Sequence, residues 1–408
     1  MLVSVLVALA VVMVTARVVG AMFKRLGQPA VIGEVIGGLL LGPSLLGRIS
    51  PEGAATLLPS ESAPFLGVIA QLGVILYMFL IGLELDLGVL RSRVAATVTI
   101  SIASIALPFG LGALLAGSLY EAWAPDGIGF RSFALFLGVS MSITAFPVLA
   151  RILDDRGLQR TPIGILALTC AAINDAVAWC LLAFVVGVTQ ATTGAAARTI
   201  VLTVIYVVLM LTAGRKIMVA TVARVDASPN VGERSLALVL VAVLLSALAT
   251  EFIGIHAIFG AFLVGAIIPH ESIIAKHATD RLQDLVRVMF LPAFFAFTGL
   301  RTEIGLVQSL DEWLLCGVII AVATAGKFGG TLLAAKVVGL DWRDSAALGI
   351  LMNTRGLVEL IVLNIGLDLG VITPRLFTML VIMALVTTIM TSPILSQLLR
   401  AQPWTAAP

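Results

Sequence analysis

Apolar residues occupy the chain in long runs separated by short polar segments, and thirteen of these runs have the length of a membrane span. They cover residues 2–22, 30–48, 66–86, 93–118, 131–150, 163–188, 199–221, 235–250, 255–272, 288–305, 313–336, 344–367 and 374–398. A helix of about 20 apolar residues crosses the hydrocarbon core of a bilayer. Backbone in lipid has to satisfy its own hydrogen bonds, so each run predicts a helix. We therefore predict an all-α polytopic membrane protein with about 13 transmembrane helices.

The composition agrees with this pattern and excludes the soluble classes of protein. Hydrophobic residues make up 60% of the 408 residues and charged residues only 12%, whereas soluble domains carry about 25% charged residues. The three cysteines lie in or beside apolar runs, without the spacing of a metal site or a disulfide framework. The sequence has no nucleotide-binding loop and no nucleophile constellation. We therefore expect no enzyme activity, no cofactor and no nucleic-acid partner.

Lysine and arginine are distributed unequally between the two sets of alternating loops. One set holds 17 of the 25 basic residues, the opposite set holds five, and three lie inside the runs. Because cytoplasmic loops carry the excess of basic residues, the N-terminus is expected outside and the C-terminus in the cytoplasm of a cell-membrane protein. The first run has no basic leader in front of it, so we expect it to be a retained span.

Three pairs of segments resemble each other in the two halves of the chain, in the same order. GEVIGGLLLGP pairs with HAIFGAFLVGAIIP, YMFLIGLELDL with AFFAFTGLRTEIG, and LGVSMSITAFPVLARIL with LGILMNTRGLVELIVLNIG. Each pair is offset by seven runs. Seven is an odd number, so the halves (runs 1–6 and 8–13) insert in opposite directions. Shared small and apolar composition is the alternative explanation, but an inverted-topology repeat is typical of secondary transporters.

Two runs in corresponding positions of the halves contain residues that interrupt helices. In 131–150, Ser142 and Thr144 precede Pro147, which removes a backbone donor and pushes the preceding residue toward extended geometry. In 344–367, Asn353, Thr354, Arg355 and Gly356 follow one another mid-membrane. A kink satisfied by neighbouring hydroxyl groups is the alternative. The correspondence predicts two crossing broken helices, with a binding site near the bilayer midplane.

Asp175, preceded by Asn174, lies near the middle of the run 163–188. A carboxylate in the centre of a membrane helix costs roughly 2.5 to 3.5 kcal/mol or more, so it usually serves function. A structural polar contact with another helix is the alternative. Because burial disfavours the charged form, a lone carboxyl group in a dry cavity binds either a proton or a dehydrated alkali cation, but not both well. That competition is the minimal machinery of cation/proton exchange.

Three further charged residues lie near the middle of the runs 313–336 and 344–367. Lys327, in AVATAGKFGGTLLAA, is expected either to form a switchable ion pair with Asp175 or to be a fixed charge that holds a helix. Arg355 and Glu359 are four residues apart and share a helix face, which favours a structural ion pair; Arg355 could instead neutralise helix ends. We treat the three as charge-compensating residues. His256 is a candidate pH sensor, with polar anchoring at an interface as the alternative.

The motifs SITAFPVLARIL, AAINDAVAW, HAIFGAFLVGAIIP and LMNTRGLVELIVLNIG resemble the monovalent cation:proton antiporter superfamily. The closest branch holds plant cation/proton exchangers and bacterial potassium-efflux antiporters, and the resemblance covers roughly residues 5 to 398. It implies a homodimer with elevator-like alternating access. It also implies an essential aspartate at Asp175 with Lys327 nearby, and polar ligands at the crossing. We expect Asp175, Asn174, Thr144 and Ser142 to bind the cation and the proton.

The resemblance further implies two parts of one transmembrane domain. A dimerisation part would comprise runs 1–3 and 8–10, about 1–90 and 235–305. An ion-translocating core would comprise runs 4–6 and 11–13, about 93–188 and 313–398. The chain ends soon after its last run, so we expect no soluble regulatory domain in it. Regulation is then absent, supplied by a separate subunit, or carried by a segment that this sequence leaves out.

The resembled family is not matched in every respect. Many electrogenic relatives have two adjacent aspartates where this chain has Asn174 and Asp175, and electroneutral relatives tend to have arginine where it has Lys327. With one carboxylate fewer, one cation per proton is expected. A gated potassium-efflux channel on the same scaffold is an alternative, although channels need continuous ligands or charge rings. A sodium-coupled organic-anion symporter is another, and it needs no mid-span aspartate beside a lysine. The sequence leaves the choice between sodium and potassium open.

Overall fold

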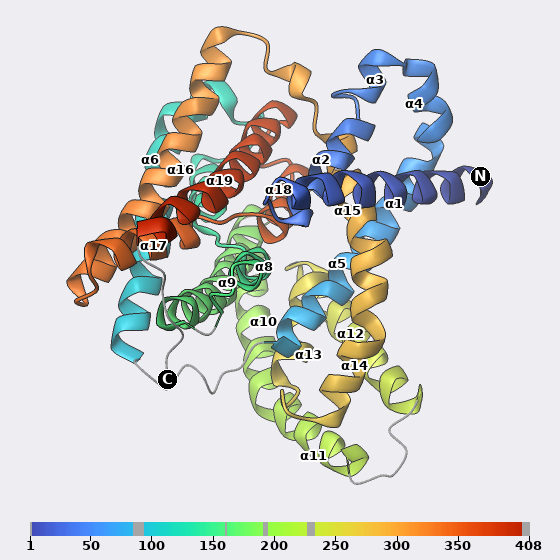
Figure 1. The fold of residues 1–408 in the computed structure, drawn as a ribbon. Coiled ribbons are helices and arrows are strands. Elements are labelled where there is room, and N and C mark those ends of the chain that lie inside the picture. The colour runs from blue at the N-terminus through green and yellow to red at the C-terminus, as the bar shows by residue number, and fades with distance from the viewer. Residues whose placement is uncertain (1, 85–93, 160, 191–194, 227–232, 402–408) are drawn as a thin grey trace. The chain divides into compact units, whose positions relative to one another are not determined.

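The computed structural model describes residues 2–84, 94–159, 161–190, 195–226 and 233–401, and within these ranges the chain is all-helical (Figure 1). Ten of the described helices are long and apolar enough to cross a membrane. The chain is therefore a multi-pass membrane protein. Its helices form two compact units, which are described one at a time.

The first unit comprises Met1–Met13, Ala55–Val89 and Ala183–Phe297. Its elements are η1 (Ser60–Ser62), α5 (Ala63–Glu84), α10 (Ala195–Leu209), the π-helix η3 (Met210–Gly214), α11 (Arg215–Asp226), α12 (Glu233–Ile253), α13 (Ala257–Ile267), α14 (Ile273–Leu285), the π-helix η4 (Val286–Phe290) and the first part of α15 (Leu291–Arg301). α13 packs against both α5 and α12. A side chain at Gly265 or Gly82 would collide with backbone of the facing helix, so the two glycines let α5 and α13 approach closely.

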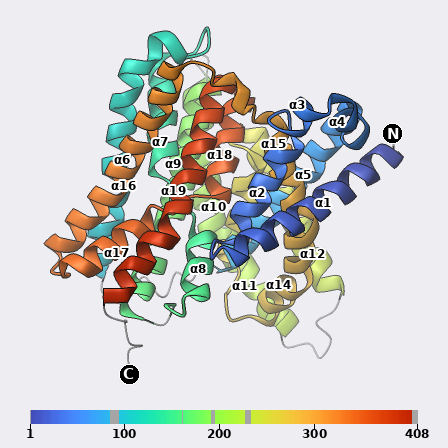
Figure 2. The same ribbon diagram turned by 45° about the horizontal axis from the view of Figure 1, so that its top comes forward.

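The second unit comprises Val14–Ala54, Leu90–Leu182 and Thr298–Pro408. Its elements are the end of α1 (Leu2–Arg25), α2 (Ala30–Leu41), α3 (Leu46–Ile49), α4 (Pro51–Leu57, reaching the first unit), α6 (Val94–Trp123), α7 (Phe130–Ser142), α8 (Phe146–Asp155), most of α9 (Pro162–Gln190), η5 (Ile304–Leu306), α16 (Leu310–Val337), α17 (Trp342–Met352), α18 (Leu357–Asp368) and α19 (Pro374–Ala401). α6 packs against α7 and α16, and both views show α16 running beside α6 (Figures 1 and 2).

Two helical spans of the second unit are interrupted near their middle. α7 ends at Ser142 and α8 begins at Phe146, while α17 ends at Met352 and α18 begins at Leu357. The two breaks meet, because the Ala145 N–H donates to the Thr354 carbonyl at 2.9 Å. Pro147 falls in the first turn of α8, where a helix has no intrahelical donor to lose.

The thirteen predicted runs all overlap helices, but three of them are not among the ten long apolar helices. The runs 131–150 and 344–367 are the interrupted ones, and 255–272 contains α13, which has only 11 residues. The predicted start of the run 288–305 was wrong, since the helix is continuous from Ile273 through η4 and α15. A polar first half hides this continuity in the sequence, because Lys276, Asp280 and Asp284 interrupt its apolar pattern.

Candidate functional site

Asp175 lies in the middle of α9 and is almost completely buried, with 3% of its surface exposed. Neither carboxylate oxygen accepts a hydrogen bond from the residues that the structure describes. The carboxyl group interacts electrostatically with the Lys327 ammonium and with the backbone N–H of Phe146. The contact with the Phe146 N–H does not have the geometry of a hydrogen bond. Phe146 is the first residue of α8, and the amino end of a helix carries partial positive charge. The carboxyl group is thus held beside positive charge without being tied to it.

Asn174 connects three parts of the second unit. Its side-chain amide donates to the Ser104 hydroxyl of α6 at 2.8 Å and to the Thr144 hydroxyl in the first break at 3.3 Å. The Thr144 hydroxyl in turn donates to the Met352 carbonyl, at the end of α17, at 2.9 Å. The residue next to Asp175 therefore links α9 to both interrupted helices.

Lys327 is fully buried in α16 and bonds to backbone carbonyls. Its ammonium donates to the Ser104 carbonyl at 2.9 Å and to the Ser142 carbonyl at the end of α7. Electrostatic interactions also couple it to Asp175, Arg355 and Glu359, so the four charged groups form one cluster. Asp175 accepts no hydrogen bond from it. In this conformation Lys327 links α16 to α6 and α7 through hydrogen bonds to their backbone carbonyls.

Two glycines near Lys327 admit the backbone or a proline of a neighbouring helix. A side chain at Gly326 would meet Pro108, and one at Gly330 would meet the Ala103 carbonyl, both on α6. Gly329 faces open space instead. The close approach of α6 brings the Ser104 carbonyl within reach of the lysine.

Arg355 is fully buried in the second break, and its guanidinium caps α7. It donates to the Ser140 carbonyl at 2.7 Å and to the Met141 carbonyl at 2.6 Å. It also forms an ion pair with Glu359, at 3.3 Å between Nη1 and Oε2. Both geometries considered for Arg355, the ion pair one turn away and the neutralised helix end, are present together. The last three carbonyls of α7 therefore all accept from cationic side chains.

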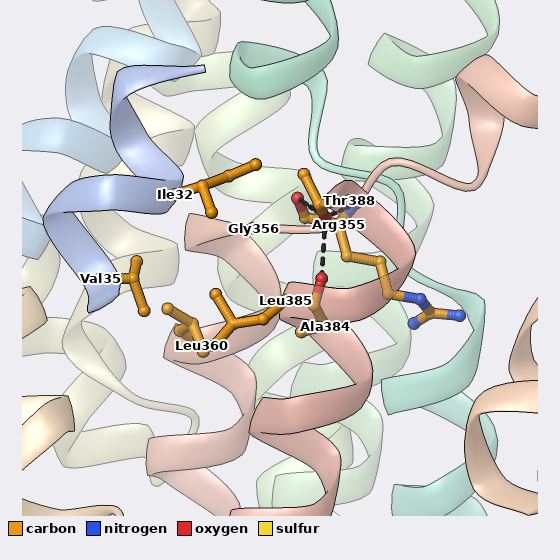
Figure 3. A pocket seen from close by; sticks show the side chains of 8 residues that line it. All are labelled: Ile32, Val35, Arg355, Gly356, Leu360, Ala384, Leu385 and Thr388. Atoms are coloured by element: carbon orange, nitrogen blue, oxygen red, sulfur yellow. Dashed lines mark hydrogen bonds between the residues drawn. The ribbon is translucent and has the colours of Figure 1, made fainter. Parts of the chain in front are cut away.

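The backbone of Arg355 is fixed by α19, beside a small pocket that faces away from the charged cluster. The Arg355 N–H donates to the Thr388 hydroxyl at 2.9 Å, and that hydroxyl donates back to the Arg355 carbonyl at 2.7 Å. The pocket is lined mainly by apolar side chains of α2, α18 and α19, and Figure 3 shows the guanidinium extending away from Ile32 and Val35. The residues that line the pocket therefore offer no carboxylate to a cation.

The remaining predicted residues occupy different environments. The Ser142 hydroxyl donates to the Val139 carbonyl at 2.8 Å within its own helix, so its carbonyl is the group that contacts the cluster. His256 belongs to the first unit, where it precedes α13 with a positive φ of 73°. Its pH-sensing role stays a prediction. Ser104 was missed by sequence reasoning, because nothing distinguishes it from the other small residues of α6.

Comparison with known proteins decides the family. The sodium/hydrogen exchanger transmembrane family matches residues 11–401. The chain belongs to this family. The resemblance stated from the motifs is thus confirmed, and a family of transporters agrees with the expectation that the chain is not an enzyme.

Several curated relatives match most of the chain. The Na(+)/H(+) antiporter NhaS4 of Synechocystis sp. is 45% identical over 93% of this chain and 93% of its own. The Cation/H(+) antiporter 17 of Arabidopsis thaliana is 40% identical over 94% of this chain. The K(+)/H(+) antiporter 1 of Saccharomyces cerevisiae is 35% identical over 91% of it. The chain spans about half the length of the plant and yeast relatives, 47% and 44% respectively.

A solved structure shares the fold. The sodium proton antiporter MjNhaP1 from Methanocaldococcus jannaschii superposes with a TM-score of 0.72, covering 98% of this chain and 97% of that protein. The two sequences are only 14% identical, so this likeness concerns the fold alone.

Proposed function

We propose that this chain is a monovalent cation/proton antiporter that exchanges sodium or potassium for protons by alternating access. The family, and relatives that are named as sodium/proton, cation/proton and potassium/proton antiporters, support this proposal. The observation that carries it is the Asp175 carboxyl group, which is buried beside the meeting point of two interrupted helices and accepts no hydrogen bond from the described residues. Such a group is open to either a proton or a cation.

Asp175 binds the two ions in turn. A carboxylate in a dry environment is stabilised either by protonation or by a cation. Thr144 in the first break and Ser142 at the end of α7 offer their hydroxyl oxygens, and the Asn174 amide holds the Thr144 hydroxyl in place. An alkali cation needs several oxygen ligands to replace its hydration shell. The interrupted helices place such side-chain oxygens beside Asp175 at the point where the two breaks meet.

The charge count of the buried cluster favours one cation per proton. With all four side chains ionised, Lys327 and Arg355 balance Asp175 and Glu359, so the cluster is neutral. Protonation of Asp175 brings the net charge to plus one, and a bound alkali cation brings it to the same value. The two loaded forms then carry equal charge through the membrane potential, which is worth about 2.3 kcal/mol per charge per 100 mV. Lys327 serves as a fixed charge in this scheme, since it is bonded to carbonyls.

The architecture that we propose has thirteen spans, in an inverted repeat of runs 1–6 and 8–13. Runs 1–3 and 8–10 would form the dimerisation part, and runs 4–6 and 11–13 the moving core of a homodimer. The excess of basic residues in one set of loops supports an outside N-terminus in the cell membrane. Crosslinking of single-cysteine variants in native membranes tests the dimer.

Proteoliposomes loaded with a pH-sensitive dye test the function. A proton gradient is imposed, then sodium or potassium chloride is added, with choline chloride as the control for ionic strength. We expect a cation-driven pH change in the wild type and none with Asp175→Asn. Clamping the voltage with valinomycin and potassium should leave the final sodium-driven pH change unaltered if exchange is one for one. Cation flux without proton movement would instead identify a channel.

A further inference from the structure

The two interrupted helices end very differently at their crossing. The carbonyls of Ser140 and Met141 in α7 accept the Arg355 guanidinium, and the Ser142 carbonyl accepts the Lys327 ammonium. The carboxyl end of a helix carries partial negative charge. That charge is neutralised in α7 by two buried cationic side chains, so this end has little attraction left for a third cation.

The carboxyl end of α17 is bonded to neutral donors instead. The Gly349 and Leu351 carbonyls accept backbone N–H groups of the break at 3.1 Å, and the Met352 carbonyl accepts the Thr144 hydroxyl at 2.9 Å. The partial negative charge of this helix end is therefore retained. A bound cation would be attracted to this half of the crossing.

Asn353 follows directly at the end of α17 and is fully buried. Neither its amide oxygen nor its amide nitrogen has a hydrogen-bond partner among the residues that the structure describes. Buried polar side chains are nearly always paired, so an unpaired amide in a native structure calls for an explanation. An amide oxygen is also a hard ligand of the kind that alkali cations prefer.

Hydrogen bonds connect the residue before Asn353 to the residue before Asp175. The preceding residue, Met352, accepts the Thr144 hydroxyl, and Thr144 accepts the Asn174 amide at 3.3 Å. Two hydrogen bonds thus join Met352, Thr144 and Asn174. Asn353 is the residue after Met352, and Asp175 is the residue after Asn174. The Thr144 hydroxyl therefore joins the end of α17 to the middle of α9.

We propose that the Asn353 side-chain oxygen is a ligand of the transported cation, completing from α17 the site whose carboxylate is Asp175. This inference rests on the proposed antiport function and adds a binding residue to it. The cation would lie between the Asp175 carboxylate and the α17 end, away from the two cationic side chains that cap α7. Because a proton on Asp175 needs no second ligand, Asn353 would affect cation binding but not proton binding.

The test uses the full chain in detergent and measures how far sodium or potassium chloride raises the unfolding temperature, relative to choline chloride. A ligand that binds only the folded state stabilises it in proportion to the logarithm of its concentration over Kd. We expect Asn353→Ala to raise the cation Kd about tenfold, or about 1.4 kcal/mol, and to raise the KM of exchange similarly. Asn353→Asp, which keeps an oxygen ligand, should restore cation binding if the alanine variant folds poorly.

Ser345→Ala is the matched control. Ser345 is also buried in α17 without a hydrogen-bond partner among the described residues, but it lies two turns before the break. The control should keep the wild-type cation Kd. Suppose that cations stabilise the wild-type protein and that Asn353→Ala has the same cation Kd and the same KM of exchange as the wild type. That result would overturn the Asn353 inference alone. Absence of stabilisation and of exchange in the wild type itself would overturn the proposed function, and this inference with it.

Discussion

Replacing Arg355 by methionine should destabilise the protein strongly, because Glu359 would be left buried without its partner. Both side chains are 0% exposed. Removing one member of a buried ion pair costs about 3–5 kcal/mol. An unfolding entropy of about 2.1 cal/mol/K per residue gives about 0.9 kcal/mol/K for a chain of 408 residues. The expected fall in Tm is therefore roughly 3–6 °C.

The double variant Arg355→Met/Glu359→Leu separates the ion pair from packing. Replacing both charges by apolar groups of similar size is often neutral or stabilising, so the double variant should recover most of the lost stability. It will not recover all of it, since the Ser140 and Met141 carbonyls lose their donors. Thermal unfolding can be followed with a thiol-reactive fluorophore that reports exposure of the buried Cys170 and Cys316.

Arg375→Met is the control, because Arg375 is half exposed in its ion pair with Glu312. Exposed pairs contribute about 0–1 kcal/mol, so this variant should unfold close to the wild-type temperature. The reasoning would be refuted if Arg355→Met unfolded at the wild-type temperature, or if the double variant were less stable than the single one.

Three further predictions concern other contacts. Thr144→Val should slow exchange by removing the hydroxyl that joins both breaks, while Thr144→Ser should keep activity. Equal initial rates of cation-driven pH change in Thr144→Val and the wild type would argue against this role. Lys327→Ala should lower Tm, or else alter the pH dependence of exchange, by leaving carbonyls of α6 and α7 without their donor; no change in either would exclude this anchoring role. Gly265→Val should lower the free energy of unfolding by about 1–3 kcal/mol, because the added side chain overpacks against α5. Gly110→Val should cause no such loss, because a side chain there meets nothing within 4 Å. Equal Tm values for the two variants would contradict the packing described.

The fold was largely predictable because lipid simplifies the relation between sequence and structure. Apolar runs have to become helices, and the breaks were visible as Pro147 and as the polar stretch around Arg355. Segments that combine a polar half with an apolar half were harder. The helix that starts at Ile273 begins with charged residues, so its continuity with α15 had no hydropathy signal.

The candidate site was only partly predictable. Asp175, Lys327 and Arg355 stand out in the sequence because ionisable residues are rare inside membrane spans. Their partners are mostly backbone carbonyls, which every residue possesses, so no residue type marks them. Ser104 contributes both a hydroxyl and a carbonyl, yet it is one small residue among many in α6. Such contacts depend on which helices meet, and that is a property of the packed structure.

Competition between a proton and a cation at Asp175 is the central claim, and proton release measures it directly. Sodium or potassium chloride is added to the purified protein in weakly buffered detergent with a pH indicator, against choline chloride as the control. We expect release of up to one proton per chain, greatest at a pH where Asp175 is protonated beforehand, and no release from Asp175→Asn. Equal release from Asp175→Asn, or cation binding by the wild type without release at any pH, would contradict it.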